Sequence, residues 1–177
     1  MKLLYLLILF PLLNCSGQSN LKIETIITKP TRITSQDLET GKTFERSTYI
    51  PITKRLESTI LIQDKSENNL TFLLQGNINS AGLSINKIKK IRFEKSELID
   101  ETITLKYFTE IEYIVGKEGA NVQGYNYTKQ EMYKIPRGIK KINIELYEDR
   151  IIQRAGSKHP KLKLVAQQIF DINDVII

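Results

Sequence analysis

The sequence predicts an all-β fold, a single antiparallel β-sandwich of about seven to nine strands. The main observation is a strict alternation over residues 103–115, where apolar or aromatic residues occupy nearly every second position. Successive side chains of a strand point to opposite faces, so this pattern indicates a half-buried strand. Its apolar face needs a second layer, as in a sandwich or barrel. Similar segments recur between turn residues, and none has a convincing helical period.

In chain order, we expect strands at residues 21–28, 44–52, 56–63, 70–76, 83–93, 103–115, 125–135, 141–147 and 162–170. The pair Lys29-Pro30 should end the first strand, and the polar residues 31–41 that follow have no clean period. Pro51 favours an edge strand, because proline interrupts a ladder inside a sheet.

The middle of the chain predicts a hairpin over residues 56–76, because two alternating segments flank a polar turn at 64–69. We expect residues 76–82 to form a loop. The apolar residues of 83–93 have mixed spacing, which leaves open a short helical turn within 85–90 or a strand centred on Ile91 and Phe93.

The last third resumes a period of two at Tyr125, after a glycine-rich loop at 116–124. We expect residues 125–135 to pair antiparallel with 103–115 through that loop. Ile135-Pro136-Arg137-Gly138 is a turn signal, because proline fixes φ and glycine permits positive φ. Glu148-Asp149 predicts the turn before the closing strand.

The strand-Pro-x-Gly-strand sequence at 135–146 resembles immunoglobulin-like and transthyretin-like modules of exported bacterial proteins. The resemblance implies a sandwich fold and no particular activity, since such folds host many unrelated functions.

The N-terminal segment has the features of a signal peptide. Lys2 is followed by an apolar run at residues 3–13, which is too short to cross a hydrocarbon layer of about 30 Å as a helix. Leu12-Leu13-Asn14-Cys15 then resembles the lipobox of bacterial lipoproteins, with Asn14 where a small residue is usual.

The lipobox resemblance implies that residues 1–14 are removed and that Cys15 carries the lipid. Residues 15–20 would then be a tether and 21–177 a single β-sandwich domain, anchored in the bacterial cell envelope and facing the periplasm or the exterior. The alternative is cleavage after Gly17, where small residues precede the cut, which would leave a soluble secreted protein.

The charge balance is basic, with 26 Lys and Arg residues against 20 Asp and Glu residues in 177. For an exported chain this favours anionic glycans or lipid head groups as partners, with other envelope proteins also open, and not nucleic acid. One segment concentrates the excess. Its candidate anion-binding residues are Arg137, Lys140, Lys141, Arg150, Arg154, Lys158, Lys161 and Lys163.

Other chemistry is sparse, and we expect no cofactor and no metal. The only cysteine is Cys15, which excludes a disulfide or a thiolate zinc site in the body. The only histidine, His159, lies in a polar turn without a fixed partner. Glu110 and Glu112 share the outer face of 103–115, as either a carboxylate pair for glycoside cleavage or an ordinary wet face.

Five tyrosines fall in the expected pair of strands at 103–135, where they could line a ligand cleft or stabilise a sheet: Tyr107, Tyr113, Tyr125, Tyr127 and Tyr133. The prediction for function is a non-enzymatic, membrane-anchored binding or envelope-assembly module. The alternatives are a secreted polysaccharide hydrolase and a small β-barrel that binds an apolar ligand.

Overall fold

The computed structural model describes residues 20–96, 98–154 and 157–173, which form strands and no helix. This confirms the predicted all-β fold. The strands are β1 (Leu21–Gln36), β2 (Thr43–Pro51), β3 (Thr59–Lys65), β4 (Asn69–Asn79), β5 (Ser84–Lys95), β6 (Thr102–Val115), β7 (Val122–Lys134), β8 (Lys141–Arg154) and β9 (Ser157–Asp171). In this part of the chain, no helix is long and apolar enough to span a membrane.

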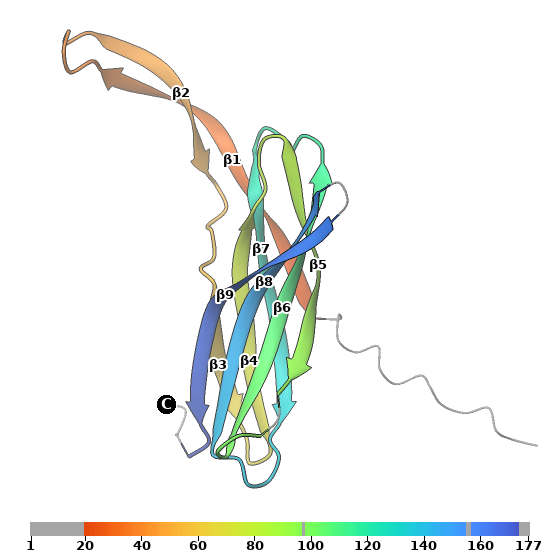
Figure 1. Cartoon of the computed structure of the whole chain (residues 1–177). Helices are drawn as coiled ribbons and strands as arrows, with labels where there is room; N and C mark the ends of the chain where they lie inside the picture. The colour runs from red at the N-terminus through yellow and green to blue at the C-terminus, as the bar shows by residue number, and fades with distance from the viewer. Residues whose placement is uncertain (1–19, 97, 155–156, 174–177) are drawn as a thin grey trace, which may run out of the picture.

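The strands form two sheets that face each other (Figure 1). One has five strands in the order β2-β1-β7-β4-β3, and the other has four in the order β5-β6-β8-β9. The core lies between them. Phe72 on β4 meets Tyr107 on β6 edge to face, with ring centroids 5.7 Å apart. The fold is therefore a two-layer sandwich.

Strand β6 behaves as its alternation predicts. Ile103, Leu105 and Ile111 are buried against the opposite sheet. Further along the same face, Tyr113 is 44% exposed and Val115 is 85% exposed, because the end of β6 runs beyond the core. This face is thus buried only where a second layer covers it.

The expected pairing of β6 with β7 is wrong. β7 pairs with β1 and β4 in the five-stranded sheet, whereas β6 pairs antiparallel with β5 and parallel with β8. The connection at 116–121 crosses from one sheet to the other, and the chain returns to β8 in the direction of β6. Alternation shows which residues face inward, and it does not show which strands are neighbours.

Three expected boundaries are also wrong. β1 continues through Lys29-Pro30, since beyond Thr28 it has a neighbour on one side only, where proline is tolerated. β4 extends into the expected loop at 76–82, and β8 runs through Glu148-Asp149. By contrast, Gly138 has a φ of +80°, as the predicted turn at 135–138 requires.

A charged pair is buried on the inner face of β7. Lys129 is 4% exposed, its Nζ lies 2.6 Å from Glu131 Oε1, and it donates to the carbonyl oxygen of Ile91 at 3.5 Å. The Lys129 ammonium has lost its water and depends for stabilisation on Glu131, whose side chain is 22% exposed.

We expect Glu131→Gln to lower the free energy of unfolding by about 3 kcal/mol, because it leaves the buried Lys129 ammonium without its counter-charge. The double variant Lys129→Met, Glu131→Leu should unfold at or above the wild-type urea concentration, since it removes both desolvated charges. Urea unfolding monitored by circular dichroism measures both. A double variant less stable than Glu131→Gln would contradict this account.

Candidate functional site

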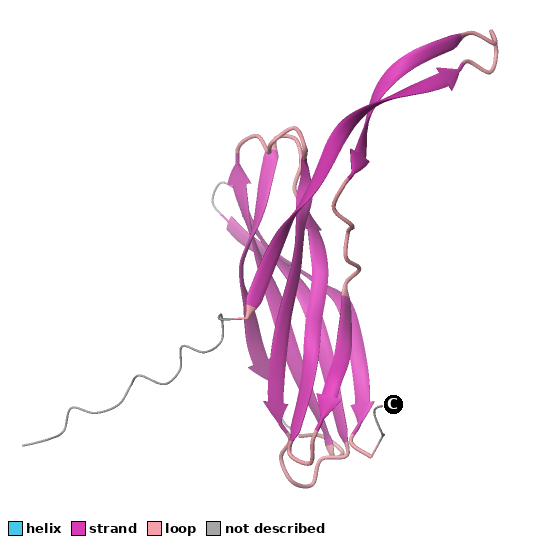
Figure 2. Cartoon of the chain, turned by 180° about the vertical axis from the view of Figure 1, so that it is seen from behind, coloured by secondary structure: helices cyan, strands magenta, loops and turns pink. Residues whose placement is uncertain are grey.

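The most exposed element of the structure is the outer part of the β1–β2 hairpin, residues 28–51, which we call the arm. β1 pairs with β7 only as far as Ile27, and the arm projects beyond the sandwich as two paired strands (Figure 2). Every described residue of β2 is exposed except Thr48. The tip carries Leu38, which is fully exposed.

One face of the arm gathers apolar and β-branched side chains. Residues that oppose one another across the two strands share a face. The pairs Lys29↔Ile50, Thr31↔Thr48, Ile33↔Arg46 and Ser35↔Phe44 therefore lie on the same face, where two cationic side chains accompany the apolar and β-branched ones. Phe44 is 49% exposed and Ile50 is 41% exposed. These side chains form a surface that the rest of the described chain leaves uncovered.

The segment after the arm, residues 52–58, is the connector to β3, and it is pinned to the five-stranded sheet. At its start, the backbone amide of Ile52 donates to the carbonyl oxygen of Ile27 at 2.8 Å. Further along, the buried Asn126 side chain accepts from the Leu56 amide at 2.9 Å and donates to the carbonyl oxygen of Lys54 at 2.8 Å. Asn126 therefore fixes where the connector crosses the sheet.

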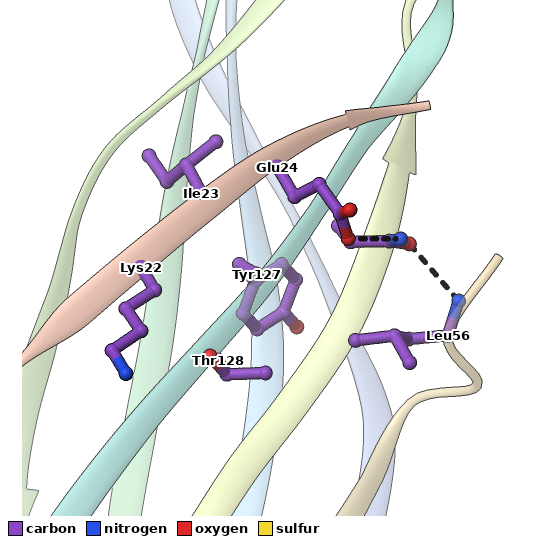
Figure 3. Close-up of a pocket in the computed structure, with 7 residues that line it drawn as sticks. Lys22, Ile23, Glu24, Leu56, Tyr127 and Thr128 are labelled. Atoms are coloured by element: carbon purple, nitrogen blue, oxygen red, sulfur yellow. Dashed lines mark hydrogen bonds between the residues drawn. The ribbon is translucent and has the colours of Figure 1, made fainter. Parts of the chain in front are cut away.

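A small pocket of about 200 Å³ lies beside this crossing, between β1, β7 and the connector (Figure 3). Glu24 and Lys22 line it from β1, and Leu56 closes it from the connector. Asn126 Nδ2 also donates to Glu24 Oε2 at 3.4 Å. The pocket is thus part of the base that sets the direction of the arm.

We expect Asn126→Ala to lower the free energy of unfolding by about 2 kcal/mol, because it leaves the Leu56 amide and the Lys54 carbonyl oxygen of the connector without hydrogen-bond partners. Trypsin should then cleave faster after Lys54 and Arg55. Gln130→Ala, an exposed change on the same strand, is the control and should alter neither the free energy of unfolding nor the rate of trypsin cleavage. Unchanged trypsin cleavage in the Asn126 variant would show that other contacts fix the connector.

A second, more polar pocket opens where the two sheets part, and we call it the basic pocket. β3 begins at Thr59, opposite Gln75, so β4 has no strand beside it on that edge from Gly76 onward. The pocket is about 330 Å³, and an adjoining hollow of about 210 Å³ shares Glu148, Arg150 and Lys163 with it. Together they are lined by Ser58, Asn77, Asn79, Glu148, Arg150, Lys161, Lys163, Leu164 and Val165.

Cations outnumber anions among these lining residues. Arg150 donates from Nε and Nη2 to Glu148 Oε2, at 3.1 Å and 2.9 Å. Glu148 is 8% exposed, so this pair is largely removed from water. Lys161 and Lys163 are exposed on β9. Lys163 lies opposite Glu148 in the register, but Glu148 pairs with Arg150, and neither lysine forms an ion pair with a described acidic side chain. The pocket is therefore net positive, with one carboxylate at its inner side.

Buried hydroxyl groups lie behind the basic pocket. A Cβ added to Gly76 would lie 2.6 Å from the Tyr127 hydroxyl and 2.9 Å from Ser58 Oγ, so both oxygens lie against the glycine, which leaves them the space. The hydroxyls of Tyr127 and Thr109 are both buried, and neither has a partner at full hydrogen-bond geometry within the described part of the chain. Burial raises the pKa of the Tyr127 hydroxyl to about 12; the neighbouring Thr109 hydroxyl lowers this pKa in part, and the Glu148 charge adds a small further rise.

The predicted basic segment divides between the two ends of the sandwich. Its members Arg150, Lys161 and Lys163 meet in the basic pocket. Arg137, Lys140 and Lys141 lie at the other end, where Lys140 pairs with Glu101 at 2.6 Å. The side chains of Arg154 and Lys158 lie outside the described residues, as does Cys15.

The structure also adds lining residues that the sequence did not suggest. Glu148 was expected in a turn, yet it is an inward-facing strand residue opposite Thr109. Ser58, Asn77 and Asn79 are uncharged and come from about 70–100 positions earlier in the chain. Only the continuation of the alternation from Leu146 to Glu148 could have indicated one of these positions.

The carboxylate pair considered for glycoside cleavage lies on the outer face of β6. Glu110 Oε1 accepts from Arg92 Nε at 3.2 Å and lies 3.6 Å from Lys90 Nζ. Glu112 is exposed. Neither residue lines the pockets described above. The arrangement is that of an ion-paired strand surface.

The remaining candidates are dispersed. Tyr107 and Tyr127 are buried on opposite sheets, so the tyrosines do not share one hairpin. The side chain of His159 lies outside the described residues. Among the described residues, no three His, Cys, Asp or Glu side chains gather as a metal site would require.

Comparisons with protein-family models, with curated proteins and with solved structures found no match to this chain. The arm and the basic pocket are therefore the features from which a function can be proposed.

Proposed function

We propose that this chain is an exported, membrane-anchored lipoprotein that acts by contact, as a binding or assembly module of the bacterial envelope. The observation that carries the proposal is the arm, which extends past the sandwich with an uncovered face of apolar, β-branched and cationic side chains. The lipobox-like sequence ending at Cys15 supports the anchor.

The physical argument for contact starts from the stability of the arm. A two-stranded hairpin is marginally stable alone in water, and it gains stability when another layer covers one face. Phe44 and Ile50 offer such a face. Charged residues and proline blunt strand edges against indiscriminate pairing, and the arm carries Lys29, Pro30 and Pro51. These features favour a specific partner that packs on the face.

The geometry of an anchored chain would place the arm away from the lipid. Residues 15–20 can span at most about 20 Å, so the start of β1 would stay near the membrane. The 16 residues of β1 then extend about 50 Å from that point to the arm tip. An anchored body could therefore present the arm to a partner well outside the lipid surface.

For the anchor, we expect Cys15→Ala to release the chain from the membrane fraction, because it removes the only site for lipid attachment. Intact mass of the mature wild-type protein should show added acyl chains on a chain that starts at Cys15. Ser16→Ala is the control and should stay with the membranes. A Cys15→Ala variant that still sediments with membranes would exclude acyl anchoring.

For the arm, we expect a photo-crosslinking residue at Phe44 to give one covalent adduct of defined mass in intact membranes. The same probe at Met132, which is 71% exposed on β7, should give none. Ile50→Glu, which places a charge on the same face, should abolish the adduct. Equal adducts at positions 44 and 132, or none at 44, would rule out recognition through the arm.

A further inference from the structure

We propose that the basic pocket binds an anionic sugar residue, a monosaccharide unit that carries a carboxylate or phosphate together with free hydroxyl groups. The proposal rests on the proposed function, because it names the ligand class of the binding module. It is carried by the convergence of cationic, amide and hydroxyl side chains from both sheets on one open pocket.

The cationic side of the pocket explains the preference for an anion. Arg150, Lys161 and Lys163 come from adjacent strands and line one hollow. Glu148 accepts both Arg150 donors through a single oxygen, Oε2, which leaves the Nη1 group of Arg150 outside this pair. Arg150 is thereby oriented by Glu148, and the two lysines supply charge that the pocket does not neutralise. A ligand with one anionic group fits this balance.

Glu148 also argues against a simple inorganic anion as the intended ligand. Its largely buried carboxylate would repel a bare anion placed against it, and the same oxygens accept hydrogen bonds from hydroxyl groups. A sugar can place its anionic group beside the lysines and a hydroxyl beside Glu148, so that the lysines meet a negative charge and the carboxylate meets a hydrogen-bond donor.

The wall from the five-stranded sheet supplies further hydroxyl-binding groups. Arg55 Nη1 donates to the side-chain oxygens of both Asn77, at 3.4 Å, and Asn79. This fixes the Asn79 amide so that its Nδ2 remains the donor end for a ligand. Ser58 adds a hydroxyl on the same wall. Such amide and hydroxyl groups suit the vicinal hydroxyls of a sugar.

The volume of the basic pocket and its apolar side, formed by Leu164 and Val165, suit a single sugar unit. A pocket of about 330 Å³ is at the small end of ligand sites. Leu164, which is 45% exposed, and Val165 offer an apolar surface for the C–H face of a pyranose ring. The pocket is open to solvent, so one residue of a longer glycan could enter it.

The test is isothermal titration of the full-length chain, purified in mild detergent, with glucuronic acid, glucose 6-phosphate, glucose and inorganic phosphate. We expect at least one anionic sugar to bind about tenfold or more tightly than both glucose and phosphate, with affinity falling as salt rises. Tighter binding of glucuronic acid would indicate an acidic polysaccharide as the source, and tighter binding of glucose 6-phosphate a phosphorylated glycan or glycolipid.

Two variants locate the binding site. Lys163→Gln removes one exposed pocket charge and should weaken the anionic sugar about fivefold or more. Asn79→Leu should weaken the sugar while leaving inorganic phosphate unchanged. Lys141→Gln, at the other end of β8, is the matched control and should bind as wild type. Circular dichroism of each variant checks that it folds.

The proposal is overturned by any of three results. These are the absence of binding by either anionic sugar, phosphate binding as tightly as the sugars, or an equal effect of Lys163→Gln and Lys141→Gln. Membrane fractionation of the same variants separates this outcome from the proposed function. A chain that sediments with membranes, yet binds no sugar, keeps its anchor and loses only the ligand assignment.

Discussion

The structure depends on the burial of alternate side chains of β4, β6 and β8 between the two sheets. Leu70, Phe72 and Leu74 on β4 are fully buried against the inward residues of the opposite sheet. Removing such side chains from water contributes about 25 cal/mol for each Å² of apolar surface, the main favourable term in folding. The arm and the basic pocket both lie where this two-layer contact ends.

The basic pocket follows from the unequal lengths of the facing strands. β3 begins only at Thr59, while β4 and β8 continue past the apolar core. The alternation of β8 continues as well, so Glu148 and Arg150 face Ser58, Asn77 and Asn79 at the edge where β3 is absent from the opposite sheet. An inward-facing charge needs a partner or water, and the Glu148–Arg150 pair meets part of that need. The sandwich therefore ends in a polar, charged opening.

The arm also results from unequal strand lengths, at the edge of the five-stranded sheet opposite β3. β1 is longer than the sheet that supports it, and its outer half has only β2 as a neighbour. Asn126 and the Ile27 carbonyl oxygen fix the connector that leaves the arm, so the hairpin has a defined base. A rigid body with a fixed base and an uncovered hairpin face suits recognition by contact, which is the proposed role.

The sequence alone determined that the chain is all-β and which residues of β6 face inward, because side chains alternate in every strand whatever its neighbours. It also marked Arg150, Lys161 and Lys163 as part of one basic segment. The tertiary structure decided that β7 crosses to the other sheet, that Glu148 belongs to a strand, and that Ser58 and Asn79 meet the cations. Strand partners and converging sites depend on long-range packing, which a local period of two does not encode.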